Sequence, residues 1–252
     1  MVLHYVGHGT VLVEMDGVRL LTDPLLRTRV LHLRRAVPLE RETLIGVDAV
    51  LISHGHYDHL DRRSLQLLGD RPLAIVPRGL ATIVRGCGLK NVVEVVEGQE
   101  VEVRGVRVIA THADHEGDRP FPRIDADAVG YAILGSRRVY FAGDTDLFSG
   151  MEGLVPDLDV ALLPIWGWGP TLGGGGHLDP IRATEALGLL RPRIVVPIHW
   201  GTYHPFHLGI RRLPDFLTEP ADEFVQAARE HAPDVEVRVL QPGESLTLDG
   251  DR

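Results

Sequence analysis

The chain contains 252 residues, of which 44 % are hydrophobic, and its formal net charge is −9. This length suffices for one large domain or two small ones, and the acidic balance argues against a general nucleic-acid binder, which usually presents a basic surface. No apolar run approaches the roughly 20 residues of a membrane helix, no secretory signal is visible at the N-terminus, and a single cysteine excludes an internal disulfide, so a cytoplasmic location is expected.

Short aliphatic and β-branched segments bounded by Gly, Pro or Asp recur along the chain and predict strands. They are residues 10–15, 18–22, 48–53, 73–76, 92–96, 106–110, 129–134, 138–143, 159–165, 193–198 and 235–240. Helices are predicted at residues 61–69, 179–190 and 221–231. Asp61 and Asp179 are the expected N-caps of the first two, and Pro180 suits a first helical position. Without a visible linker or repeat, we expect a single α/β domain over residues 1–252.

Two segments, 25–47 and 116–127, fit neither pattern. Long irregular loops are often functional, although a solvated surface excursion explains either segment equally well. Residues 25–47 alternate leucines with arginines. We hypothesise that they form a substrate lid or a dimer contact, in which Arg34 and Arg35 hold an anionic group and the leucines cover an acyl chain or a second subunit.

The stretch "ISHGHYDHLD" at residues 52–61 gathers metal-binding side chains directly after a predicted strand. His54 and His56 are two residues apart, and in extended backbone such side chains point the same way, so they can grip one ion. Asp58 and His59 lie further round the turn and can reach a second ion. Imidazole and carboxylate together suit zinc, iron or manganese. The alternative, a hydrogen-bonded histidine cluster without metal, is disfavoured by four candidate ligands in six residues.

The hexapeptide "HGHYDH" fits the H-x-H-x-D-H signature of the metallo-β-lactamase fold. Further segments resemble the branch that includes N-acyl-phosphatidylethanolamine phospholipase D and bacterial ascorbate-6-phosphate lactonase: "GHGTVLVEMDGVRLLTDP", "FAGDTD", "GHLDP" and "PIHWGTY". The resemblance covers nearly the whole chain. It implies a four-layer αββα sandwich with two divalent metal ions at one edge, zinc being the expected metal and manganese or iron the alternatives.

The same resemblance implies the metal ligands. His54 and His56 match ligands of the first metal, and Asp144 matches the carboxylate that bridges both metals. The second metal is matched by Asp58, His59 and His199. One ligand of the first metal remains to be chosen between His112 and His115 in "ATHADHEG". The family pattern T-P-A-x-H favours His115, with His112 in the place of the proline as a spare imidazole.

Two such ions would stand about 3.5–4 Å apart and could hold a hydroxide at neutral pH, because metal coordination lowers the pKa of water to roughly 7. The implied activity is hydrolysis of an ester, lactone, amide or phosphodiester, with Asp58 in the catalytic set. His177 in "GGGGHLDP" would bind an oxyanion or protonate the leaving group; a structural role at the helix entry is the alternative. The expected substrate is a small or lipid-like molecule, anionic if the 25–47 arginines bind it, and a homo-oligomer stays open.

Three other functions share this fold. Di-iron oxygen reductases typically carry a carboxylate where His56 stands, and no flavin domain follows here. Nucleases share the signature, but the acidic chain lacks an added nucleic-acid clamp, so nucleic acid is not the expected partner. A non-catalytic metal-binding module is disfavoured by the complete ligand set.

Residues beside the ligand motifs have weaker expectations. Asp23 ends a predicted strand and can accept a proton from a ligand histidine, or merely cap an Asx turn. His8, in the tight "GHGT" loop, lies near the same edge by resemblance and is expected to be structural and not a ligand. Tyr57 is expected either to form a hydrogen bond with substrate or to pack under the metal loop.

Further from the signature, the aromatic and glycine-rich residues 166–176 are expected to line one side of the pocket mouth. His204 and His207 are expected to be exposed loop residues, and Cys87 to be a packing residue.

Overall fold

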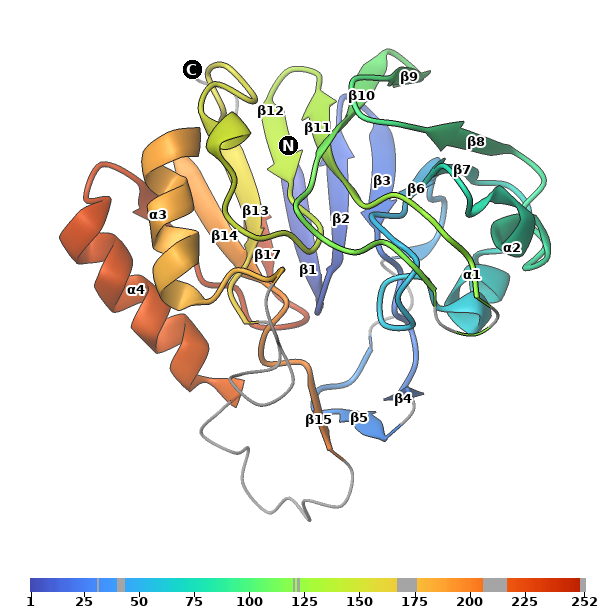
Figure 1. Cartoon of the computed structure of the whole chain (residues 1–252), viewed down its shortest axis with the longest axis horizontal. Helices are drawn as coiled ribbons and strands as arrows, with labels where there is room; N and C mark the ends of the chain where they lie inside the picture. The colour runs from blue at the N-terminus through green and yellow to red at the C-terminus, as the bar shows by residue number, and fades with distance from the viewer. Residues whose placement is uncertain are drawn as a thin grey trace.

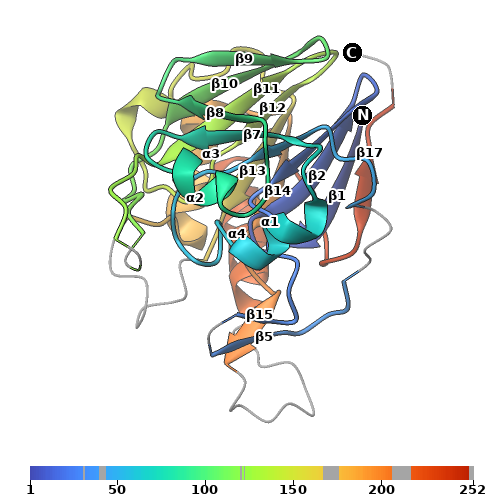
Figure 2. The same ribbon diagram turned by 90° about the vertical axis from the view of Figure 1, so that its right-hand side faces the viewer.

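The computed structural model describes residues 1–30, 32–39, 44–119, 121, 123–166, 176–205 and 217–249. Two seven-stranded sheets face each other, and helices cover the outer side of each (Figure 1). The view at right angles shows the same layers (Figure 2). The αββα sandwich implied by the sequence resemblance is therefore confirmed.

The first sheet has the strand order β17-β1-β2-β3-β6-β7-β8. Its strands are β1 (Val2–Gly7), β2 (Thr10–Met15), β3 (Val18–Thr22), β6 (Ala49–Leu51), β7 (Leu73–Pro77), β8 (Val92–Val95) and β17 (Ser245–Thr247). The β1–β2–β3 meander is antiparallel, whereas β3, β6, β7 and β8 run parallel. The last strand of the chain pairs with the first, since Val2 lies opposite Thr247.

The second sheet has the strand order β16-β14-β13-β12-β11-β10-β9. Its strands are β9 (Glu100–Val103), β10 (Val106–His112), β11 (Val129–Leu134), β12 (Arg138–Phe141), β13 (Val160–Pro164), β14 (Ile194–Ile198) and β16 (Glu236–Val237). Strands β12, β13 and β14 are parallel. Their continuous apolar sequences suit strands that are covered on both faces.

Three apolar layers hold the sandwich together. Residues such as Tyr5, Val13, Tyr131 and Phe141 fill the space between the two sheets. The helices α1 (Arg62–Leu68) and α2 (Ala81–Arg85) cover the first sheet, and α3 (Pro180–Leu190) and α4 (Glu219–His231) cover the second. A short 3₁₀ turn spans Ser149–Met151. None of the helices in the described ranges combines the length and apolarity needed to cross a bilayer.

The predicted helix starts are confirmed. The Asp61 carboxylate accepts from the Ser64 backbone N–H, and that of Asp179 accepts from the Arg182 N–H. Such caps satisfy amide groups that have no partner within the helix, and Pro180 follows Asp179 because a first-turn residue needs no N–H.

A small third sheet lies below the sandwich in Figure 1. It joins β15 (Tyr203–Pro205) to β5 (Leu33–Arg35) and β4 (Arg29–Val30). The side chains of Leu25, Val30, Leu33 and Tyr203 form its own apolar cluster. Much of the 25–47 segment is therefore ordered by packing against the chain itself; Leu31 and residues 40–43 lie outside the described residues.

Candidate metal centre

Polar side chains follow the ends of strands at the edge of the sandwich that faces the small sheet. His54 comes after β6, His115 after β10, Asp144 after β12 and His199 directly after β14. Because β6 and β14 belong to the parallel parts of the two sheets, their carboxyl ends meet at one edge. The seven residues matched by resemblance are brought together there.

The first cluster consists of His54, His56 and His115. The Nε2 atom of His54 lies 2.9 Å from Nδ1 of His56, and Nε2 of His115 lies 3.3 Å from the same atom. His115 Nδ1 donates to the Gly176 carbonyl over 2.8 Å, which leaves Nε2 as the nitrogen with a free lone pair. His56 and His115 are half-buried, whereas His54 is fully buried.

His112 points away from this cluster. Its Nδ1 lies 3.1 Å from the Glu97 Oε2 atom, and its side chain is 47 % exposed. The geometry thus favours His115 over His112 as the third first-cluster residue.

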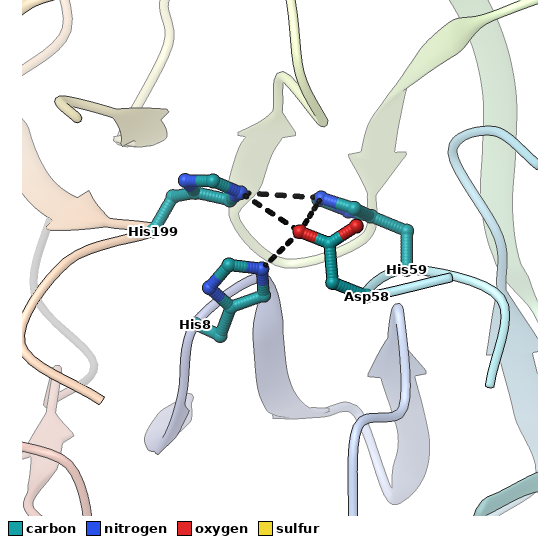
Figure 3. Close-up of side chains that lie close together, drawn as sticks. All are labelled: His8, Asp58, His59 and His199. Carbon is teal, nitrogen blue, oxygen red and sulfur yellow. Dashed lines mark hydrogen bonds and ion pairs between the residues drawn. The ribbon is translucent and has the colours of Figure 1, made fainter. Parts of the chain in front are cut away.

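The second cluster consists of Asp58, His59 and His199 (Figure 3). The Nε2 atoms of the two histidines are 3.2 Å apart, and Asp58 Oδ2 lies 3.7 Å from His59 Nε2 and 3.9 Å from His199 Nε2. Both imidazoles are about 1 % exposed. Separations of this size are those of atoms that converge on one ion at about 2.1 Å each.

Asp144 lies between the clusters. Its Oδ2 is 3.1 Å from His59 Nε2, and its Oδ1 is 3.4 Å from His199 Nε2. Among the described residues, Oδ1 is buried without a hydrogen-bond partner. A buried carboxylate oxygen of this kind calls for a cation, because its desolvation is otherwise uncompensated.

Burial sets most of the protonation states in the two clusters. It lowers the pKa of His54 well below 6.5, that of His56 to about 4 and that of His199 to about 3. Neutral imidazole is the form that binds metal.

His59 is the exception among the histidines. Burial lowers its pKa, but the carboxylates of Asp144, Asp58 and Asp23 outweigh burial and raise it well above 6.5. Burial also raises the pKa values of Asp58 and Asp144, yet the surrounding histidines hold both well below 3.8. Without metal, an imidazolium therefore stands in for a cation in the second cluster.

Asp23 accepts a hydrogen bond from His59, as expected for a residue that orients a ligand histidine. Its Oδ2 accepts from His59 Nδ1 over 2.7 Å, and its Oδ1 accepts from the Ser53 backbone N–H over 2.7 Å. The side chain is completely buried, and its residue has a φ of 31°. Asp23 thus directs His59 Nε2 toward Asp58 and Asp144.

His8 lies at the metal edge, as expected, and contacts the second cluster directly, which was not expected. Its Nε2 is 2.9 Å from Asp58 Oδ2, and its ring centroid is 3.9 Å from that of His199 (Figure 3). Its ring nitrogen also lies within 4.8 Å of the ligand atoms of the second cluster. The "GHGT" sequence offered a signal, but only strand pairing brings it to a residue 50 positions away.

His177, at the entry of α3, lies beside Asp144 and the first cluster. Its Nε2 lies 3.3 Å from Asp144 Oδ2, and its ring centroid is 4.7 Å from that of His115. The side chain is 20 % exposed, so it faces both the buried carboxylate and the outside. Of the expected pocket wall, residues 167–175 lie outside the described residues, while the Trp166 carbonyl accepts from His199 Nδ1 over 2.8 Å.

The 116–127 segment supports the signature loop from outside. The Arg119 guanidinium donates to the carbonyls of Gly55 and Leu60 over 2.9 and 3.0 Å and stacks on Tyr57. The Tyr57 hydroxyl donates to the Phe121 carbonyl over 2.8 Å. Tyr57 therefore packs within the loop structure.

The expectations for His204 and Arg35 need correction, whereas the expectation for Cys87 is confirmed. His204 is not an exposed loop residue: it lies in β15, is 5 % exposed and pairs with β5, while His207 lies outside the described residues. Arg35 is buried and donates to the carbonyls of Val6, Val37 and Leu25, so it is not available to an anionic substrate; Arg34 is exposed. Cys87 is buried in the apolar layer under α1 and α2, as a packing residue would be.

Comparisons with known proteins place the chain in a family. Residues 18–200 match the family model described as a beta-lactamase superfamily domain. A UPF0173 metal-dependent hydrolase of Methanopyrus kandleri is 31 % identical over 97 % of this chain and 99 % of its own. The N-acyl-phosphatidylethanolamine-hydrolyzing phospholipase D 1 of Caenorhabditis elegans is 29 % identical over 95 % of this chain and 74 % of its own.

Solved structures show the same fold. Igni18, a metallo hydrolase from Ignicoccus hospitalis, matches with a TM-score of 0.73 and 26 % identity over 98 % of both chains. CmlA, a diiron β-hydroxylase from Streptomyces venezuelae, matches with a TM-score of 0.73 and 22 % identity over 98 % of this chain and 54 % of its own.

Proposed function

The chain belongs to the β-lactamase superfamily and is a metal-dependent hydrolase, and from this premise we propose that it works with two divalent ions held by seven side chains. The first ion would be bound by the first cluster, the second by the second cluster, and Asp144 would bridge them. The observation that carries the proposal is the placement of Asp144 within 3.4 Å of His59 and His199 and beside His177, which adjoins the first cluster.

The side chains fit such ions chemically. The seven donors are five imidazoles and two carboxylates, a set that suits zinc, with manganese or iron as alternatives. The unpartnered Oδ1 of Asp144 supplies a buried negative charge at the shared position. When bound, the ions would activate water near neutral pH and polarise the electrophilic centre of an ester, lactone, amide or phosphodiester.

The remaining work falls to residues of the chain. Asp23 fixes the tautomer of His59. His177, close to Asp144 and partly exposed, is positioned to give a proton to the leaving oxygen or nitrogen. A group with one side toward the metals and the other toward solvent can be reprotonated after each turnover.

For the substrate, we propose a small or lipid-like molecule with an apolar part. The lipid phosphodiester named for the nematode relative is one class to test, and lactones and simple esters are others. Arg34 on β5 and Arg29 on β4 are exposed arginines of the small sheet that a negative group could contact.

The test begins with elemental analysis of protein reconstituted in excess Zn²⁺ or Mn²⁺. Two ions per chain are expected, and hydrolysis of at least one compound from a panel of lactones, esters, amides and phosphodiesters should require them. No more than about one ion after reconstitution would contradict the dinuclear proposal.

The same preparation distinguishes hydrolysis from redox chemistry. Zinc has no accessible redox change, so an active zinc form would rule out an oxygenase or reductase. Activity in the iron form alone, with oxygen consumed, would instead favour a function like that of the diiron β-hydroxylase.

A further inference from the structure

We propose that the turn Gly7–His8–Gly9, called here the GHG turn, positions the ligands of the second cluster, and that His8 is the positioning residue for Asp58. This inference rests on the dinuclear site proposed above. It concerns a residue of the first hairpin that lies outside the seven ligands.

The GHG turn is held in an unusual backbone conformation. His8 has a φ of 57° and Gly7 a φ of 127°, and few residues other than glycine adopt positive φ. A Cβ on Gly7 would lie 2.7 Å from Thr202 Cγ2, so the turn is wedged against the segment after His199. The Thr202 hydroxyl accepts from the His8 N–H over 2.7 Å, which fixes the turn in place.

From that position the turn contacts each member of the second cluster. The buried His8 ring donates from Nε2 to Asp58 Oδ2 over 2.9 Å (Figure 3). The His8 carbonyl accepts from the His199 N–H over 2.9 Å, and His199 itself has a φ of 62°. Gly9 abuts His59, since an added Cβ would lie 3.2 Å from its Nδ1.

These contacts favour positioning over direct ligation by His8. Its Nε2 lies near the second cluster, but the proton on that nitrogen is directed at Asp58, and a metal ligand would have to surrender it. A carboxylate held by such a bond keeps one orientation before an ion arrives, so less order is lost on binding. Partners of this kind typically change metal affinity by 10–100-fold.

The experiment titrates metal-free protein with Zn²⁺ against a competing chelator, resolving two dissociation constants. His115→Ala identifies which constant belongs to the first cluster. His8→Asn should then weaken the other constant by about 10–100-fold and leave the first-cluster constant unchanged. Asparagine tolerates positive φ, but its amide nitrogen stops at the position of Nδ1 and does not reach Asp58.

His8→Gln is the matched variant, because its amide nitrogen reaches the position of Nε2. It should bind the second ion within about threefold of the unchanged protein. Glutamine tolerates positive φ less well than asparagine, so a merely structural role predicts the opposite order, with Asn better than Gln in both Tm and metal affinity.

A double-mutant cycle completes the test. If His8 acts through Asp58, then His8→Asn combined with Asp58→Asn should bind the second ion no more weakly than Asp58→Asn alone. Three results would overturn the inference: additive losses of metal affinity in the double mutant, equal weakening of the binding of both ions, or an unchanged dissociation constant for the second ion in His8→Asn. A single ion in the unchanged protein would instead refute the dinuclear proposal, so the two failures are distinguishable.

Discussion

The first and second clusters are built from similar side chains but supported very differently. In the first cluster, His56 and His115 are half-buried, and His115 is held by the carbonyl of Gly176. In the second, His59 and His199 are almost completely buried. Three residues with positive φ surround the second cluster: His8, Asp23 and His199. No first-cluster residue has positive φ.

This difference suggests a division of labour. Strained backbone and buried polar networks persist only where their surroundings enforce them, and they cluster at functional sites. The second cluster is thus preorganised and intolerant of change. If the proposed ions are bound, the first cluster, whose His56 and His115 are half-buried, is the one that a substrate would reach from solvent.

The largest expected effect comes from His177, which lies beside Asp144 and His115. His177→Ala should lower kcat by about 10²–10⁴-fold, because a general acid is lost, while two ions remain bound. Steady-state kinetic assays measure kcat, and elemental analysis measures the number of bound ions. A kcat that is retained with both metals in place would return His177 to a structural role at the entry of α3.

The next test breaks the first cluster alone. His115→Ala should weaken one of the two Zn²⁺ dissociation constants by more than the roughly 100-fold typical of an outer partner. His112→Ala is its control: it removes an imidazole three residues away that pairs with Glu97, and should change neither constant. The reverse result would make His112 the ligand.

A smaller effect should appear when the support of the second cluster is weakened. Asp23→Asn removes the charge that fixes the His59 tautomer, so the second-cluster constant should rise by about 10–100-fold while the first stays unchanged. Asp16→Asn, which removes a carboxylate from the β2–β3 turn, is the matched control and should alter neither constant. Equal effects on both ions would show that the two clusters share their support.

The smallest effect is a difference in pH dependence. His59 has a pKa well above 6.5 without metal, so at pH 7 it carries a proton that the incoming ion must displace. Affinity for the second ion should therefore fall by up to about tenfold between pH 7 and pH 6. In the first cluster burial keeps the pKa of His56 at about 4, so affinity there should stay nearly constant. Calorimetric titration in buffers of different ionisation enthalpy counts the released protons; equal release at both sites would remove the asymmetry.

Local patterns predicted most of the sandwich because inner strands such as β2, β11 and β14 are apolar runs of five or six residues that contain β-branched side chains. The edge strand β9 was missed because it is a charged alternation, and β1, which lies between β17 and β2, was missed because His4 interrupts its apolar residues. The small sheet was also missed, because β5 pairs on one side with the two-residue β4 and on the other with β15, about 170 positions away. No local pattern encodes that partner.

The candidate site divides in the same way. The candidate ligands His54, His56, Asp58 and His59 were visible because they lie within six residues directly after a predicted strand, whereas His115, Asp144 and His199 were implied by the resemblance to the metallo-β-lactamase fold. The roles of His8 and Arg35 were not, because each depends on contacts across the fold. His8 reaches Asp58, and Arg35 turns inward to backbone carbonyls instead of facing substrate.

The pairing of β1 with β17 has a consequence for the order of events during synthesis on the ribosome. The histidines of the first cluster lie within residues 54–115, whereas the second cluster is complete only once His199 has been synthesised. The strand β1, which leads into the GHG turn, gains its partner β17 only when residues 245–247 have been synthesised. At roughly 5–20 residues per second, several seconds separate these points. The three histidines of the first cluster are therefore synthesised well before His199 completes the second cluster.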